Sequence, residues 1–184
     1  MTQRAPSAQR VTLEELYRRE FSQLVSLAHG LSGSRSAAEE LVQEAFLAAH
    51  RRWETIGRYD DPSAWLRRVV VNRSVGVIRR RVAEGMALTR LGSRRVLPDA
   101  LPDSDERVWQ AVRNLPRRQA QVVALFYVDD QPVHEIAAIL QCAEGTVKAH
   151  LHQARQSLAQ ALGTALPPDD VSDYCPPTHQ EVER

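Results

Sequence analysis

The polar side chains that most clearly suggest a chemical role lie in residues 144–155. Their types and spacing suggest hydrogen bonding to a polyanion. Thr146, Lys148 and Arg155 can donate to phosphates, and Lys148 or Arg155 can instead pair with guanine. The other interpretation is a helical hairpin that contacts no nucleic acid. We expect the outward, DNA-reading residues to be Glu144, Gly145, Thr146, Lys148, Ala149, His152 and Arg155.

The segment 133–152 has the pattern that positions such a set. Ile136, Ala137 and Leu140 share one face of a short helix, and the small side chain of Ala137 permits a close helix crossing. After a short turn, Val147 and Leu151 are four residues apart and can seat a second helix on the first. The pattern predicts a helix-turn-helix whose second helix enters the major groove.

A second candidate surface is rich in arginine. Residues 51–95 hold 12 Arg and 4 acidic residues, a net charge of +8 in a chain whose net charge is +1. Such a block indicates a surface for a polyanion, with a solvated basic face as the alternative. Asn72 can pair with adenine or hold an unstacked base by its edge. We expect the DNA contacts here to be Arg67, Arg68, Asn72, Arg73, Arg79 and Arg80. These residues occupy more than one helix face, so some must be solvated or paired with acidic residues of the expected N-terminal domain, residues 12–83.

The sequence does not support catalysis or metal binding. The six histidines are scattered, and none has the His-Glu-x-x-His spacing of a metal site. Cys142 and Cys175 lie 33 positions apart and form neither a disulfide framework nor a zinc motif. No Ser or Cys stands beside a recognisable base. These observations disfavour a hydrolase or a metal enzyme. We therefore expect no metal, no cofactor and no enzymatic activity.

Apolar residues recur at spacings of three and four, which predicts an all-α chain. Thr12 with Glu15, and Ser36 with Glu39, are candidate capping boxes for the first two helices, the second of which is expected to reach Trp53. Asp61-Pro62 supplies a cap and a first-turn proline for a helix from Ser63 to about Arg81. Later helices are expected from Val108, after Pro116, over 133–140 and over 144–162.

These helices are expected to form two small domains joined by a flexible linker. The predicted domains are residues 12–83 and 105–163, the linker is 84–104, and an acidic, disordered tail occupies 164–184. The chain has no apolar run long enough to span a membrane and no apolar N-terminal stretch. We expect a cytoplasmic protein.

Three stretches, in order, resemble the sigma-70 family of bacterial sigma factors. Ala38–Phe46 resembles the segment that binds core polymerase, and Asp61–Arg73 resembles the segment that recognises the promoter −10 element. Leu115–Gln119 and Glu135–Lys148 resemble the fourth region of the family. The short predicted linker leaves no room for a third-region domain, so the resemblance is to the extracytoplasmic-function group.

The resemblance implies a subunit that binds core RNA polymerase, recognises −10 and −35 elements and promotes strand opening. The −10 element would meet the arginine-rich set, and the −35 element the helix-turn-helix. The implied partners are the clamp helices of the largest polymerase subunit, the polymerase flap, promoter DNA and an anti-sigma factor. The implied core-binding residues are Glu39, Glu40, Leu41, Val42, Gln43, Glu44 and Phe46.

One rival function stays open, and the chain also departs from the family pattern. A stand-alone helix-turn-helix regulator would bind DNA without polymerase, but it leaves the Glu40–Gln43 segment unexplained. The departure lies after Lys148, where His150 and Gln153 replace two arginines of the family and Ala149 replaces a serine. Fewer fixed charges imply weaker phosphate anchoring and an altered −35 preference.

Overall fold

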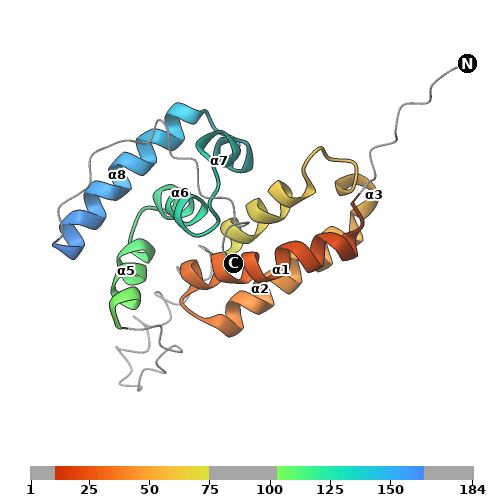
Figure 1. Cartoon of the computed structure of the whole chain (residues 1–184), viewed down its shortest axis with the longest axis horizontal. Helices are drawn as coiled ribbons and strands as arrows, with labels where there is room; N and C mark the ends of the chain where they lie inside the picture. The colour runs from red at the N-terminus through yellow and green to blue at the C-terminus, as the bar shows by residue number, and fades with distance from the viewer. Residues whose placement is uncertain (1–10, 75–102, 164–184) are drawn as a thin grey trace, which may run out of the picture.

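The structure, a computed structural model, describes residues 11–74 and 103–163. Within these ranges the chain is helical and has no strand, which confirms the all-α prediction. A helix without a label in Figure 1 covers residues 62–74. The labelled elements are α1 (Leu13–Ser32), α2 (Arg35–Arg51), α3 (Trp53–Ile56), α5 (Asp103–Arg113), α6 (Arg117–Tyr127), α7 (Val133–Leu140) and α8 (Glu144–Leu162).

Helix α1 begins where the sequence predicts. The Thr12 hydroxyl accepts from the backbone N–H of Glu15 at 3.2 Å, and a Glu15 carboxylate oxygen accepts from the Thr12 N–H at 2.8 Å. This reciprocal capping box is confirmed. The helix passes through Gly30 and ends before Gly33, whose φ of 68° lies in the left-handed region that favours glycine.

The second predicted cap and the length of its helix are both wrong. Ser34, not Ser36, is the N-cap of α2, because its hydroxyl accepts from the N–H of Ala37. Ser34 also has the extended backbone of a cap residue, whereas Ser36 is already helical. The helix ends at Arg51, because Arg52 leaves helical geometry with φ −125°, and the short α3 starts anew at Trp53.

The arginine-rich helix begins as expected. Its first residue is Pro62, and the Asp61 carboxylate accepts from the Ser63 N–H at 2.8 Å. The predicted end near Arg81 lies outside the described residues. Helix α5 already begins at Asp103, within the segment predicted as linker. The rest of that linker and the predicted tail also lie outside the described residues.

The helix-turn-helix is present with the predicted bounds. Helices α7 and α8 are joined at Gln141, which takes the left-handed conformation with φ 54°. Ala137 is buried at the crossing, and Val147 and Leu151 have no exposed surface. Cys142 in the turn is half-buried against the core, as expected of a small apolar side chain.

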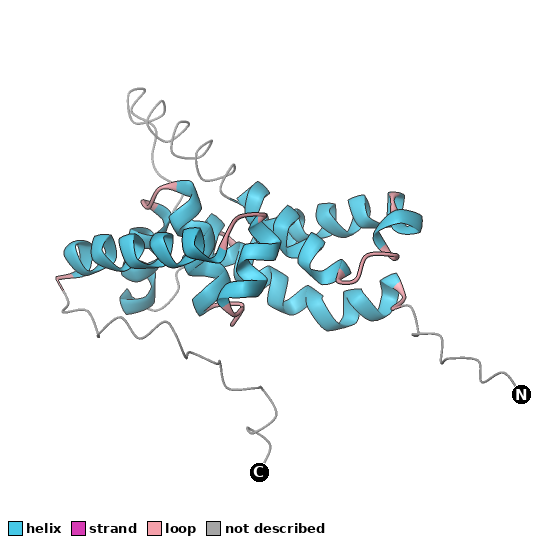
Figure 2. Cartoon of the chain, turned by 90° about the horizontal axis from the view of Figure 1, so that it is seen from above, coloured by secondary structure: helices cyan, strands magenta, loops and turns pink. Residues whose placement is uncertain are grey.

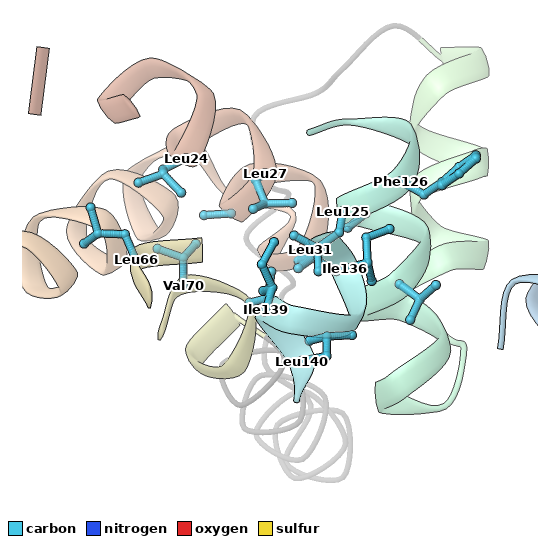
Figure 3. Close-up of a cluster of buried hydrophobic side chains, with 14 of the residues drawn as sticks. Leu24, Leu27, Leu31, Leu66, Val70, Leu125, Phe126, Ile136, Ile139 and Leu140 are labelled. Atoms are coloured by element: carbon cyan, nitrogen blue, oxygen red, sulfur yellow. The ribbon is translucent and has the colours of Figure 1, made fainter. Parts of the chain in front are cut away.

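The two groups of helices share a hydrophobic core. Helix α1 contacts both α5 and α6, so the groups lie side by side (Figure 2). Figure 3 shows Leu27 and Leu31 of α1 in the same cluster as Leu125 of α6 and Ile136 of α7. Burial of these aliphatic side chains stabilises the packed arrangement through the hydrophobic effect.

The corrected cap of α2 gives the first testable prediction. Ser34→Ala should lower the free energy of unfolding by about 0.5–1 kcal/mol, because the Ala37 N–H loses its side-chain acceptor. Ser36→Ala, the matched control, should change it by less than about 0.3 kcal/mol, because Ser36 is exposed and lies inside the helix. Urea unfolding of both variants measures the difference, and an equal loss in both would contradict the assignment.

Candidate polymerase and nucleic-acid interfaces

The outer face of α2 carries the acidic and amide residues predicted to bind core polymerase. Glu40, Gln43 and Glu44 are exposed, and Glu39 is half-buried. Glu39 accepts from the Arg35 guanidinium at 3.1 Å one turn away. The face is therefore acidic and open to a basic partner helix.

Three residues of the same predicted set are buried, and two of them, Leu41 and Val42, lie on the inner face. Leu41, Val42 and Phe46 are all buried, and Val42 has no exposed surface. Leu41 and Val42 belong to the core of the first domain and do not reach the outer surface of α2. Their placement follows the helical period, because they alternate with the exposed Glu40, Gln43 and Glu44.

An apolar groove of about 580 Å³ continues the outer face of α2 towards α1. It is lined by Leu13, Glu14, Tyr17, Gln43, Phe46, Leu47 and His50. The Tyr17 ring meets the Phe46 ring edge-on at a centroid distance of 4.9 Å, and Leu47 is 55% exposed. Exposed apolar surface beside an acidic face is typical of a protein-binding site.

The predicted −35 residues lie on the outer side of α8. Glu144, Gly145, Thr146, Lys148, Ala149 and His152 are exposed, and Arg155 is half-buried. The N-cap Ala143 makes no side-chain cap, so the first amide groups of α8 stay available to an anion. A methyl group added at Gly145 would meet no atom within 4 Å, which indicates open space in front of the helix start.

Arg155 and its neighbour Gln153, towards the C-terminal end of α8, both form hydrogen bonds with α6. The Arg155 Nε donates to the Tyr127 hydroxyl at 2.7 Å, and its guanidinium lies 5.8 Å from the Tyr127 ring centre. Gln153, which stands where the family has arginine, accepts from the Gln119 amide at 3.2 Å. The members of the predicted −35 set at the start of the helix, Thr146 and Lys148 among them, remain exposed.

Arg67, one of the predicted DNA contacts of the arginine-rich helix, instead bonds to other residues of the protein. Arg67 is only 12% exposed and bridges two carboxylates. Its Nη2 lies 2.8 Å from a Glu20 oxygen, and its Nε donates to Asp129 at 2.6 Å. Glu20 belongs to α1 and Asp129 to the turn after α6, so this buried charge cluster joins the two domains.

Burial and ion pairing act in opposite directions on the charged groups of this cluster. Burial raises the pKa of Asp129 above its usual range, although the Arg67 charge acts in the opposite direction. Burial alone would lower the pKa of Arg67, but Asp129 and Glu20 together raise it. The ion pairs therefore offset only part of the desolvation of Asp129, as is common for buried charges.

Asn72 also points at the other domain. Its side-chain Oδ1 accepts from Arg117 at 2.8 Å and from Gln121 at 2.9 Å, both in α6. Gln121 is fully buried and donates as well to the carbonyl of Val71 at 3.3 Å. Sequence reasoning missed Gln121, because an amide in the middle of an apolar helix carries no sign of its partner.

The remaining members of the arginine-rich set differ in their surroundings. Arg73 is exposed and donates to Glu44 of α2 at 2.7 Å. Arg68 is half-buried. Arg79 and Arg80 lie outside the described residues. The expectation that some of these arginines pair with acids of the first domain is confirmed for Arg67 and Arg73.

The described ranges lack both a metal-binding cluster and a membrane-spanning helix. Residues 11–74 and 103–163 contain no group of three or more His, Cys, Asp or Glu side chains able to hold a metal ion. None of the described helices is long and apolar enough to cross a membrane.

Two family models match the chain, and together they cover more than half of it. Residues 16–84 match "Sigma-70 region 2" and residues 105–158 match "Sigma-70, region 4". The chain is 33% identical over 163 residues to the ECF RNA polymerase sigma factor SigM of Mycobacterium tuberculosis, covering 84% of this chain and 79% of that protein. It is 31% identical over 152 residues to the RNA polymerase sigma-E factor of Streptomyces antibioticus, covering 82% and 84%.

Two solved structures share the fold. The sigma factor RpoE of Bartonella quintana, in complex with the anti-sigma factor NepR, superposes with a TM-score of 0.63 at 22% identity, covering 83% of this chain and 98% of that one. CnrH in complex with the cytosolic domain of CnrY gives a TM-score of 0.61 at 21% identity, covering 82% and 87%. Both likenesses support the arrangement of helices described above.

The buried charge cluster predicts a large difference between neighbouring arginines. Arg67→Ala should lower the free energy of unfolding by about 3 kcal/mol, because the buried Asp129 loses the charge that compensates its burial and Glu20 loses one of its two arginine partners. Arg68→Ala should change it by less than about 0.5 kcal/mol, because Arg68 is not part of the cluster. Chemical denaturation of both variants checks the result, and similar stabilities would count against the cluster.

Proposed function

The chain belongs to the sigma-70 family of RNA polymerase sigma factors, within the extracytoplasmic-function group, and on this basis we propose a role for each surface. The outer face of α2 binds core polymerase, α8 reads the −35 element, and the helix of residues 62–74 reads the −10 element and helps to open the strands. The proposal depends above all on one observation: the −35 set of α8 faces outward while the opposite face packs on α7.

Core polymerase binds through charge and apolar contact together. The carboxylates of Glu40 and Glu44 attract a basic clamp helix of the largest subunit, which favours fast association. The groove beside them offers Tyr17, Phe46 and Leu47 to apolar side chains of the same helix. This groove extends the predicted core-binding set onto α1.

The two DNA elements are read in different ways. The start of α8 enters the major groove at −35, where Lys148 and Thr146 hold phosphates or base edges. At −10, unstacking a base costs a few kcal/mol, which capture of that base in a pocket can offset. Asn72 supplies an amide able to hold the edge of such a base.

The chemistry of transcription belongs to the polymerase, and this subunit supplies recognition and strand opening without being an enzyme. It works in the cytoplasm, because that is where bacterial polymerase meets DNA. An anti-sigma protein is a further proposed partner. Support for it comes from the solved structure of RpoE, which is described in complex with the anti-sigma factor NepR.

Run-off transcription with core polymerase and a promoter library tests the proposal. A sigma factor directs the polymerase to start at templates that share one −35 and −10 pair. A stand-alone regulator would bind DNA without polymerase and would give no new start sites. Absence of any specific start would overturn the proposed function.

The apolar groove predicts a specific loss of polymerase binding. Leu47→Glu should weaken binding to core polymerase about tenfold or more, because an exposed apolar contact becomes a carboxylate in the centre of the interface. Val108→Glu is the matched control, because Val108 is also an exposed apolar residue but lies on α5. Binding is measured by fluorescence anisotropy with labelled protein, and equal losses would exclude the groove from the interface.

The −35 surface predicts a change in salt dependence. Lys148→Ala should weaken binding of holoenzyme to a −35 duplex and reduce the slope of log affinity against log salt by about 1, because one phosphate contact is lost. Gln160→Ala, also exposed on α8 but near its far end, should leave the slope unchanged. The slope is measured by titration at several salt concentrations, and an unchanged slope for Lys148→Ala would contradict the phosphate contact.

A further inference from the structure

Lys148 differs chemically from every other basic side chain of the protein. The sequence holds 24 lysine and arginine residues, and Lys148 is the one lysine among them. An arginine guanidinium stays protonated and delocalised, whereas a lysine ammonium can lose a proton and then act as a nucleophilic amine. A reagent that acylates amines can therefore neutralise Lys148 and leave the charge of every arginine in place.

The structure leaves the side chain of Lys148 accessible. Lys148 is exposed, and so are Glu144 and His152, which lie one turn before and one turn after it on α8. Within residues 11–74 and 103–163, no carboxylate forms an ion pair with Lys148. A methyl group built at Gly145 would meet no atom within 4 Å, so the space in front of the helix start is open to a small reagent.

The positive charge of the predicted −35 surface depends on this one amine. Helix α8, which the structure describes over its whole length, has one other fixed cation, Arg155. Arg155 is half-buried, and its Nε donates to the Tyr127 hydroxyl at 2.7 Å. His150 and Gln153 stand where the family has arginines, and neither supplies a fixed charge. Modification of Lys148 would therefore remove the one fully exposed fixed charge of the helix.

We propose that Lys148 is an acylation site and that acetylation there switches off recognition of the −35 element. The ammonium first loses a proton to solvent, and the neutral Nζ attacks the carbonyl carbon of an acyl phosphate or an acyl thioester. An N–C bond forms, the C–O or C–S bond of the donor breaks, and phosphate or thiolate leaves while the amine gives up a second proton. The inference rests on the proposed function only for the role of α8 at the −35 element.

The product has a different chemistry at the DNA surface. The amide keeps one N–H donor and gains a carbonyl acceptor, but it has lost the charge that releases counterions from DNA. It also no longer offers a guanine the cation that can donate to its O6 and N7 atoms. The polymerase-binding face of α2 contains no lysine, so acetylation leaves Glu40 and Gln43 unchanged. The acetylated chain therefore still joins core polymerase and reads the −35 element poorly.

Mass spectrometry of the full chain tests the site itself. The purified chain is incubated with acetyl phosphate in one arm and with acetyl-CoA in the other, because these donors share the activated acetyl group and differ in the leaving group. An acetyl group on Lys148 in either arm supports the site, and the reactive arm identifies the class of donor. Lys148→Arg keeps the N-terminal amine and should gain no acetyl group on α8. Absence of acetylated Lys148 in both arms would overturn the proposed site.

A relocated lysine is the matched control for position. Gln160→Lys in the Lys148→Arg background offers the same donors a single side-chain amine. Gln160 is exposed on the same helix but lies near its far end, outside the predicted −35 set. Acetylation of this variant therefore changes the charge of α8 by the same amount at a different place.

Binding to a −35 duplex tests the switch. Each chain is acetylated, checked for complete modification and repurified before assembly with core polymerase, and each holoenzyme is compared with its own untreated form. Acetylation of the parent should weaken binding about tenfold and lower the slope of log affinity against log salt by about 1. Treatment should change neither value for Lys148→Arg or for the relocated lysine. Unchanged binding by the acetylated parent, or an equal loss with the relocated lysine, would overturn the switch.

Failure of this inference can be distinguished from failure of the proposed function. Mass spectrometry uses neither polymerase nor DNA, so it tests the site whatever run-off transcription shows. An untreated parent holoenzyme that does not depend on the −35 duplex would refute the proposed function. Equal binding by the untreated and acetylated parent would refute the switch alone. Fluorescence anisotropy should give the same affinity for core polymerase before and after acetylation, and a loss of that affinity would contradict an effect confined to α8.

Discussion

The arrangement of this protein depends on a buried charge cluster at the junction of its two domains. Arg67 lies between Glu20 of α1 and Asp129 of the turn after α6, with nitrogen–oxygen distances of 2.8 and 2.6 Å. Removing Arg67 would leave Asp129 as an uncompensated buried charge, whereas separating the domains returns Asp129 to water and leaves the Arg67–Glu20 pair within the first domain. The cluster therefore specifies how the domains meet without making their contact irreversible.

The three proposed interaction surfaces differ in their relation to this junction. The outer face of α2 and the start of α8 point away from it, so they are available whether the domains are together or apart. Two members of the proposed −10 set face the junction, because Arg67 bonds to Asp129 and Asn72 bonds to α6. Arg73 links two of the proposed surfaces, because its partner Glu44 belongs to the face of α2 that we propose binds polymerase. A clamp helix that engages Glu44 would compete with Arg73.

Local structure could be predicted well because it depends on contacts between residues close in sequence. The Thr12–Glu15 box, the Asp61–Pro62 cap and the bounds of α7 and α8 all follow from such contacts. The error at Ser36 shows the limit of this reasoning. Several serines near a helix start satisfy the same pattern, and backbone geometry decides which one is the cap.

The sequence by itself determined the helical periods, the outward side of α8 and the order of the family segments, because each depends on residue spacing along the chain. Only the tertiary structure decided which groups Arg67, Asn72 and Gln121 bond to, because their partners lie 45 to 62 positions away in the sequence. It also decided that the Trp109 ring of α5 packs against Gly30 of α1. The local sequence pattern around a charged or amide side chain is the same whether that side chain faces DNA or another helix. Only packing between distant segments decides between these two surroundings.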